Sequence, residues 1–350
     1  MDRNKVLVIS NYIKHYRIPF FNELSKTYDL TVAYSMGEKP DERMCRFQIM
    51  YLPIYKIGRF ILQKGNLVKL AKKYDCVVSL GEISWLKNMS LPWFGVKTVY
   101  HAIGVAASYK VHYDSKYRWD KLRDYFFSKA NALAFYTEYP ITKAKLNGKD
   151  TSNMFVAINT VEVHPVEKLP SDSILFIGTI YKEKGLQKLL NAYKIALEKT
   201  DMPILNIVGT GPDMDDLKTW CNENGLVNKI NFTGAIYEES QKAAYFSRAY
   251  ACISPDQAGL SVLESMGYGV PFITSKNAIT GGESLNIENQ VNGVVYEKDD
   301  ELVDILIDIV QNPNKYERLG IEAQKYYSEN ATISHMAKGM VSAIEYAMQN

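Results

Sequence analysis

The sequence contains no long uninterrupted apolar run. Its apolar stretches are short, as in KVLVIS at 5–10, and none approaches the roughly 18 apolar residues that cross a bilayer. The first stretch is also shorter than the apolar core of a secretion signal. We therefore expect a protein that is not integral to a membrane and has no signal peptide.

Cysteine and proline are scarce. The four cysteines, Cys45, Cys76, Cys221 and Cys252, lie far apart, which fits neither a disulfide framework nor the close pairs of a zinc site. Only 12 residues are proline, and 47% are hydrophobic. This composition is typical of a globular chain and not of a disordered one. We expect a folded cytosolic protein with reduced thiols.

Charge is unevenly distributed although the net charge is only +2. Up to Lys168 there are 26 basic and 15 acidic residues, and beyond it 15 and 24, so the halves carry +11 and −9. The stretch from Arg43 to Tyr74 is basic throughout and contains no acid. It is either a basic amphipathic surface for anionic lipid or a helix face exposed to water, and the residues leave both open.

Short β-branched runs alternate with stretches of helical period, which is typical of parallel sheets covered on both faces. At 350 residues the chain is long enough for two such domains. We expect domains at 1–165 and 166–330, joined by a linker at 161–173 that contains two prolines and no helical period. The remaining residues, 331–350, have the period of a helix.

The pattern predicts six strands in each half of the chain. Their sequences are KVLVIS, LTVAYS, CVVSL, KTVYHA, ALAFYT and MFVAIN, and then ILFIGT, ILNIVGTG, INFTGAI, ACISP, VPFITS and NGVVYE. Between the strands of the second half we expect helices that include 186–199, 214–224 and 238–247. The fold class is α/β, with two doubly wound Rossmann-like sheets.

The segment SPDQAGLSVLESMGYGVP, 254–271, has the features of a phosphate site. It follows a predicted strand, and Gly259 stands where a helix from about Leu260 begins. Free N–H groups at a helix start attract phosphate, and glycine lets the anion come close. Asp256 and Glu264 then stand on either side of a diphosphate. Lys184, in another strand-to-helix turn, is the candidate cation.

In these residues the second half resembles the donor-binding domain of the retaining GT-B glycosyltransferases of family GT4. The signature of that family is an acid, seven residues and a glutamate, matched by Asp256 to Glu264. Its other motifs are matched by FIGTIYKEKG, VGTGP, NFTGAI and TGGESLNIENQVNGVVY. Five motifs occur in the family's order over about 120 residues.

The resemblance implies two Rossmann-like domains that face a central cleft, with a C-terminal helix crossing back to the first domain. It also implies retaining transfer from a nucleotide diphosphate sugar, with no cofactor and no required metal. The catalytic residues would be Asp256, His101 and Lys184. The donor would be bound by Gly178, Thr179, Gly209, Gly211, Ile236, Tyr237, Gly259, Leu260, Ser261 and Glu264.

The chain departs from the family at two donor-site positions. Asp256 replaces the usual glutamate and is one methylene shorter, and Thr179 stands where an arginine is usual. The first half resembles the family less closely and lacks a double glycine after its first strand. There, His101 matches a histidine beside the transferred sugar. A weaker prediction assigns acceptor binding to His15, Tyr16 and Arg17.

The expected protein is a glycosyltransferase on the inner face of the cytoplasmic membrane, bound peripherally through its basic half. A lipid-linked or oligosaccharide acceptor would fit the assembly of capsule, lipopolysaccharide or another surface glycan. A sugar-nucleotide epimerase and a non-catalytic binding subunit are the alternatives. A dehydrogenase is disfavoured because no G-x-G-x-x-G follows the first strand. No nucleic-acid module is recognisable.

Overall fold

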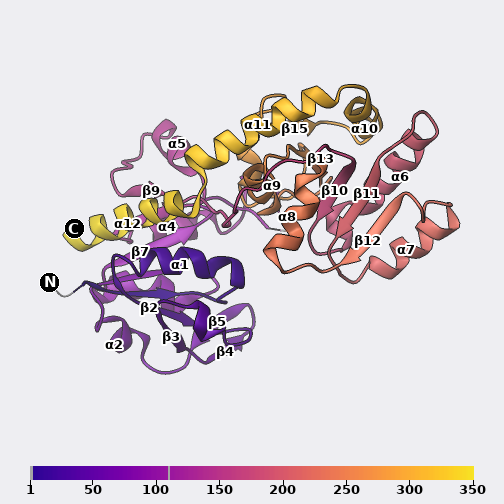
Figure 1. Ribbon diagram of the computed structural model, residues 1–350. Coiled ribbons are helices and arrows are strands. Elements are labelled where there is room, and N and C mark those ends of the chain that lie inside the picture. Colours follow the sequence, from indigo (N-terminus) through magenta and orange to yellow (C-terminus); the bar gives the residue numbers. More distant parts are fainter. Residues whose placement is uncertain (1–2, 109–110) are drawn as a thin grey trace. The chain divides into compact units, whose positions relative to one another are not determined.

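A computed structural model describes residues 3–108 and 111–350. The chain forms two compact units, each drawn as a sheet with helices around it (Figure 1). The first unit contains the residues up to 107 together with 114–162 and 332–350. The second contains 163–331 together with Ser108 and 111–113. Residues 157–172 form neither helix nor strand.

The first unit is built on a seven-stranded sheet of order β3-β2-β1-β6-β7-β8-β9, in which all paired strands are parallel. The central strands are almost entirely buried, which explains their nearly continuous apolar sequences. The strands are β1 Lys5–Ile9, β2 Asp29–Tyr34, β3 Gln48–Tyr51, β6 Cys76–Leu80, β7 Thr98–Ala102, β8 Ala132–Phe135 and β9 Met154–Val156.

The helices of the first unit are mostly short. A short antiparallel hairpin, β4 Ile54–Ile57 and β5 Phe60–Gln63, lies outside the main sheet. The helices are α1 Ile18–Leu24, α2 Leu67–Ala71, α3 Leu86–Met89, α4 Asp120–Phe127, α5 Tyr139–Leu146 and α12 Ile333–Gln349, with 3₁₀ turns η1 His15–Arg17, η2 Glu42–Met44 and η3 Leu91–Phe94.

The second unit has a six-stranded parallel sheet of order β12-β11-β10-β13-β14-β15. Its strands are β10 Ser173–Ile177, β11 Ile204–Val208, β12 Ile230–Gly234, β13 Ala249–Ile253, β14 Phe272–Ser275 and β15 Gly293–Tyr296. Its helices are α6 Leu186–Leu197, α7 Met214–Glu223, α8 Glu239–Ser247, α9 Ser261–Gly267, α10 Glu301–Gln311 and α11 Pro313–Asn330, with 3₁₀ turns η4 Lys182–Lys184 and η5 Glu283–Asn286.

The predicted α/β class with a parallel sheet in each half is confirmed. All twelve predicted strands are present, and the helices expected at 186–199, 214–224 and 238–247 are α6, α7 and α8. The sheet of the second unit has the order 3-2-1-4-5-6 when its strands are numbered along the chain. This is the strand order of a Rossmann fold.

The basic segment 43–74 does not form the helix face that was one of its two interpretations. It contains β3, the β4–β5 hairpin and only one short helix, α2. The β-branched and aromatic residues of 48–63, such as Ile49, Tyr51 and Ile57, favour extended backbone. That helix interpretation was wrong because strands of four residues are too short for periodicity to distinguish them from helix.

The last helix, α12, packs within the first unit against α1, β8 and β9. Its buried face is apolar and includes Met336, Met340 and Ile344. Gly339 sets how closely the helix approaches the sheet, because a Cβ at this position would lie only 1.8 Å from the carbonyl oxygen of Val156. The absence of a side chain at residue 339 is therefore required by packing.

We predict that Gly339→Ala destabilises the first unit by about 1–3 kcal/mol, since the added methyl group forces α12 away from β9. Alanine is intrinsically better than glycine in a helix, so propensity alone predicts the opposite sign. Ser342→Ala, at an exposed position of the same helix, is the control and should change little. Thermal unfolding followed by circular dichroism checks this, and a stabilised Gly339→Ala would contradict the packing role.

Candidate functional site

The strand order of the second unit brings two loops together. The direction of the connections reverses between β10 and β13, and ligands of such sheets bind at the carboxyl ends of the strands at this reversal. The loops are 178–185 after β10 and 254–260 after β13. They are joined by the amide of Asp256, which donates to the carbonyl oxygen of Lys184 over 3.3 Å.

Gly185 allows this close approach. Its φ is +70°, and a Cβ there would lie 2.6 Å from Oδ2 of Asp256, so any side chain would meet the carboxylate. The hydroxyl of Tyr181 adds a second link by donating to Oε1 of Gln257 over 2.5 Å. The lysine-glycine element, Lys184 and Gly185, is therefore in direct contact with Asp256, the first acid of the predicted signature.

Lys184 carries a buried positive charge at this junction. Lys184 as a whole residue is 8% exposed. Its Nζ lies 3.3 Å from the point where a Cβ on Gly178 would stand. Burial lowers the pKa of Lys184 to about 8, while Cys252 and Glu283 act in the opposite direction. Among the described residues Lys184 forms no ion pair within 4 Å. At neutral pH it is still protonated.

Asp256 is held by a lysine that the sequence did not single out. Nζ of Lys188, on α6, lies 2.9 Å from Oδ1 of Asp256 and 2.9 Å from Oδ2 of Asp299. Partial burial lowers the pKa of Lys188, but its hydrogen bonds to these two carboxylates outweigh burial and raise it. Lys188 thus fixes the carboxylate of Asp256 beside Gly185.

Glu264 lies on α9 and is also paired. Nζ of Lys242, on α8, donates to its Oε1 over 2.5 Å, and both side chains are largely buried. At the start of α9 the hydroxyl of Ser261 is buried, and among the described residues it has no hydrogen-bond partner. A Cβ on Gly259 would meet nothing within 4 Å, so the backbone there borders open space. This end of the site has polar groups available for a ligand.

Gly209 and Gly211 have a packing role. A Cβ on Gly209 would lie 1.8 Å from the carbonyl oxygen of Gly178, and one on Gly211 would lie 1.9 Å from that of Ile180. The amide of Ile180 donates to the carbonyl of Thr210 over 2.9 Å. These glycines therefore let the loop after β11 press against the loop that carries Lys184.

The remaining predicted donor residues lie at the rim of the second unit. Thr179 is exposed, and Leu260 is the partly exposed residue before α9. Ile236 and Tyr237 follow β12, at the same carboxyl edge of the sheet, and Tyr237 is 75% exposed. Ile236 lines a shallow pocket of about 470 Å³ beside α8.

His101 lies in the first unit, at the end of β7. Its Nε2 is 3.3 Å from the carbonyl oxygen of Ala157, and its ring is 4.7 Å from that of Tyr136. Burial, and then the charge of Arg17, lowers the pKa of His101 to about 3. The ring is therefore neutral at physiological pH, and Nε2 is the nitrogen that donates to Ala157.

The acceptor-site prediction falls partly on the same cavity. Tyr16, Arg17 and His101 line a cavity of about 230 Å³ at the carboxyl ends of β1, β6 and β7. Arg17 is already engaged, because it donates to Oδ1 of Asn159 and lies over the ring of Tyr16. His15 is exposed and is not among the residues that line this cavity.

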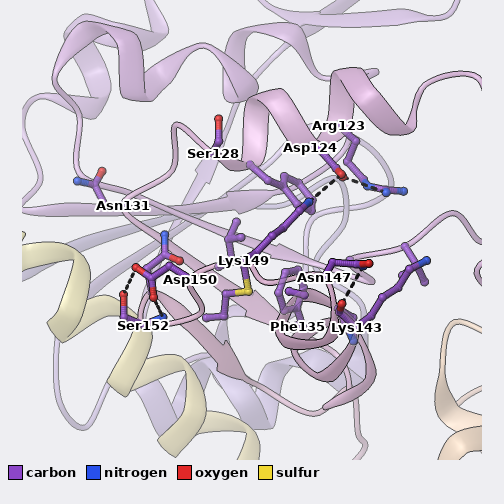
Figure 2. Close-up of a pocket in the computed structure, with 18 of the residues that line it drawn as sticks. Arg123, Asp124, Ser128, Asn131, Phe135, Lys143, Asn147, Lys149, Asp150 and Ser152 are labelled. Carbon is purple, nitrogen blue, oxygen red and sulfur yellow. Dashed lines mark hydrogen bonds and ion pairs between the residues drawn. The ribbon is translucent and has the colours of Figure 1, made fainter.

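A larger pocket of the first unit, of about 770 Å³, contains none of the predicted residues. It lies among α4, α5 and the segment 147–154 (Figure 2). Its three cations are already paired, since Arg123 pairs with Asp120 and Asp124, Lys149 pairs with Asp124, and Lys143 pairs with Asp114. This pocket therefore does not offer the unpaired positive charge found at Lys184.

Sequence reasoning missed Lys188 and Lys242. Lys188 lies four residues after Lys184 in YKEKGLQK, in the first turn of the helix that follows the loop, which is a signal that could have been noticed. Lys242 is 22 residues from Glu264 and only the packing of α8 beside α9 brings them together. Glu283, buried on η5, accepts hydrogen bonds from the amide of Gly281 and the hydroxyl of Thr280.

Within residues 3–108 and 111–350, no three His, Cys, Asp or Glu side chains are grouped so that they could hold a metal ion. In the same residues, every helix is too short or too polar to cross a membrane.

We predict that Lys184→Met stabilises the protein without ligand. The pKa of Lys184 is lowered from 10.5 to about 8, so the fold disfavours its charged form. That cost is fully present below pH 8 and disappears as the pH rises from 8 to 10.5. The variant should therefore melt a few degrees higher at pH 7, and this gain should shrink by pH 10.

Lys188→Met is the matched control for this prediction. Lys188 is stabilised by its two carboxylates, so its loss should lower the melting temperature at pH 7. A Lys184→Met protein that melts below the unsubstituted protein at pH 7 would contradict the account of Lys184 as a buried, unpaired cation.

Residues 163–326 match the family model described as glycosyl transferases group 1. Two uncharacterized glycosyltransferases of Methanocaldococcus jannaschii are also similar. One is 28% identical over 50% of this chain and 45% of its own length, and the other is 24% identical over 91% and 81%. The alpha-monoglucosyldiacylglycerol synthase of Streptococcus pneumoniae is 28% identical over 41% of this chain and 33% of its own length. The chain thus spans less than half the length of two of these relatives.

Among solved structures, Anabaena HepE in complex with UDP and glucose has a TM-score of 0.73, with 14% identity. The likeness covers 98% of this chain and 100% of that one, and it concerns the fold. The two Rossmann-like units and the C-terminal helix are those of a GT-B fold, as predicted. The segment 163–326 of this protein is thus similar to the glycosyl transferases group 1 family.

Proposed function

We propose that the protein transfers a sugar from a nucleotide diphosphate sugar to a lipid-linked or saccharide acceptor. The observation that carries this proposal is the buried, protonated and unpaired Lys184 at the junction of the loops after β10 and β13. A buried cation without an anion is costly, and a bound diphosphate would provide the missing negative charge. The family match of the same segment supports this use.

The diphosphate would lie between Lys184 and the backbone around Gly259 and Leu260. Gly259 borders open space, and the unpartnered hydroxyl of Ser261 can donate to a phosphate oxygen. Gly178 leaves room for the Lys184 ammonium beside the backbone. No metal ion is required in this proposal, because Lys184 and the N–H groups supply the positive charge.

The two acids of the signature would bind hydroxyl groups on either side of the diphosphate. Glu264 would accept hydrogen bonds from the ribose, and Asp256 from the transferred sugar. Both would otherwise be repelled by the phosphates, and Lys242 and Lys188 offset this repulsion by pairing with them. Ile236 and Tyr237 would lie near the base.

We propose a transfer with retention at the anomeric carbon. The acceptor hydroxyl attacks that carbon on the face from which the diphosphate departs, and its proton passes to the leaving phosphate oxygen. Negative charge then grows on the phosphate, where Lys184 and the loop N–H groups are already in place. His101 is neutral and would act as a hydrogen-bonding group for the sugar instead of a cation.

The acceptor assignment rests on the first unit and on the relatives. One relative is named for the synthesis of a glucosylated diacylglycerol, and the first half of this chain carries a net charge of +11 up to Lys168. A lipid-linked acceptor at an anionic membrane surface would fit both facts. Assembly of capsule, lipopolysaccharide or another surface glycan on the inner face of the cytoplasmic membrane is the corresponding role.

Donor binding is tested by the effect of nucleotide sugars on the melting temperature of the intact protein. A ligand that binds only the folded state raises it in proportion to occupancy. We expect one nucleotide sugar to raise it, and Lys184→Met and Glu264→Ala to remove this rise. Glu322→Gln, an exposed acid on α11, is the control and should keep it. A rise that persists in Lys184→Met would overturn the diphosphate assignment.

Turnover gives an independent prediction. With the donor identified above and a lipid acceptor in detergent, we expect Asp256→Asn and Lys184→Met each to lower kcat by about 10²-fold or more. Conversion of the nucleotide sugar to another nucleotide sugar without acceptor would instead identify an epimerase. Donor binding with neither reaction would identify a binding subunit.

A further inference from the structure

Three aromatic side chains gather on the surface of the first unit. Trp93 and Phe94, on η3, are 49% and 52% exposed, and Tyr125, on α4, is 51% exposed. The rings of Trp93 and Tyr125 are 6.1 Å apart, and Nζ of Lys129 lies 5.5 Å from the Tyr125 ring. We call these four residues the aromatic patch. Single exposed apolar residues are ordinary, but two large exposed aromatics in contact, Trp93 and Tyr125, with exposed Phe94 next in sequence, mark an interaction surface.

The buried ring of Phe126 fixes the patch. It lies 5.2 Å from the ring of Trp93, so η3 is held against α4 while the outer rings remain in water. The other end of α4 repeats the same chemistry at Trp119. Both Arg59, at the tip of the β4–β5 hairpin, and Arg118 lie over its ring, at 4.8 and 5.2 Å. The two groups are about 9 Å apart along the helix.

The charges around these rings are positive. Lys121, one turn before Tyr125 on α4, is exposed. The two acids of α4, Asp120 and Asp124, are balanced by two cations, because Arg123 pairs with both and Lys149 also pairs with Asp124. The surface therefore carries positive charge that the acids of α4 do not balance, from Lys121, Lys129, Arg59 and Arg118.

We propose that the aromatic patch and its flanking cations bind an anionic lipid bilayer, with Trp93 and Phe94 in the headgroup region. Tryptophan and tyrosine favour this region because one end of the side chain is apolar and the other polar. Lysine and arginine beside them are attracted to anionic headgroups. Water-exposed aromatics that lose their contact with water on binding provide the apolar part of the affinity.

This assignment rests on the proposed function, since it orients the first unit toward a lipid-linked acceptor. It places the contact mainly at η3 and α4. From the basic segment 43–74, only Arg59 is known to belong to this surface, through its contact with Trp119.

The test is sedimentation of the full chain with vesicles, without nucleotide or acceptor. One set is phosphatidylcholine alone, and the other contains about one third phosphatidylglycerol. We expect binding to the anionic vesicles and a blue shift of tryptophan emission that is lost in Trp93→Phe. Trp93→Ser with Phe94→Ser should lower partitioning at least tenfold, and Lys121→Glu with Lys129→Glu by a similar factor.

The matched controls are Ile321→Ser, at a residue of α11 that is 59% exposed, and Lys338→Glu on α12. Both should bind vesicles as the unsubstituted protein does. Equal binding to neutral and anionic vesicles, unchanged partitioning of the serine pair, or a dimer held together through Trp93 would each overturn the proposal. The melting-temperature rise with a nucleotide sugar reports on the second unit separately, so donor binding and membrane binding can fail independently.

Discussion

The candidate site depends on one unfavourable feature, a lysine ammonium buried without an ion-pair partner among the described residues. Lys184 is kept in this position by the backbone of the loop after β10, and that loop is supported by glycines whose side chains would collide with it. Packing elsewhere in the fold thus offsets the free energy that is lost by burying the charge of Lys184. In the proposed function, the positive charge is therefore in place before the diphosphate arrives, so little reorganisation would be needed on binding.

The parallel sheet explains why this lysine has the right neighbours. Strands β10 and β13 are adjacent in space although 71 residues lie between Ile177 and Ala249 in sequence. The carboxyl ends of both strands lie where the strand order reverses. Asp256 and Glu264 come from the second of these loops and the helix after it. Each is paired with a lysine from another helix, Lys188 or Lys242, so the signature acids are oriented before any ligand is bound.

The regular elements and the signature residues were predictable because their signals are local. Buried strands such as ILFIGT are continuous apolar runs, and the junction of Lys184 and Asp256 follows from two strand-to-helix turns of one sheet. Strand β3 and the β4–β5 hairpin were missed because each of these strands has only four residues, and periodicity does not distinguish so short an apolar run from part of a helix. The pairing of Lys242 with Glu264 and the gathering of Trp93 with Tyr125 depend on packing between segments distant in sequence. The spacing of residues within one segment of the sequence gives no signal for such contacts.

The central claim concerns the charge state of Lys184, which can be measured directly. Nitrogen-15 NMR of the lysine amines, with Lys184→Met to assign the signal, gives its pKa with and without UDP. The account predicts a pKa of about 8 in the free protein and a clear increase when the diphosphate binds, since an adjacent anion favours the ammonium form. An ordinary pKa near 10.5 in the free protein, or one that UDP leaves unchanged, would contradict it.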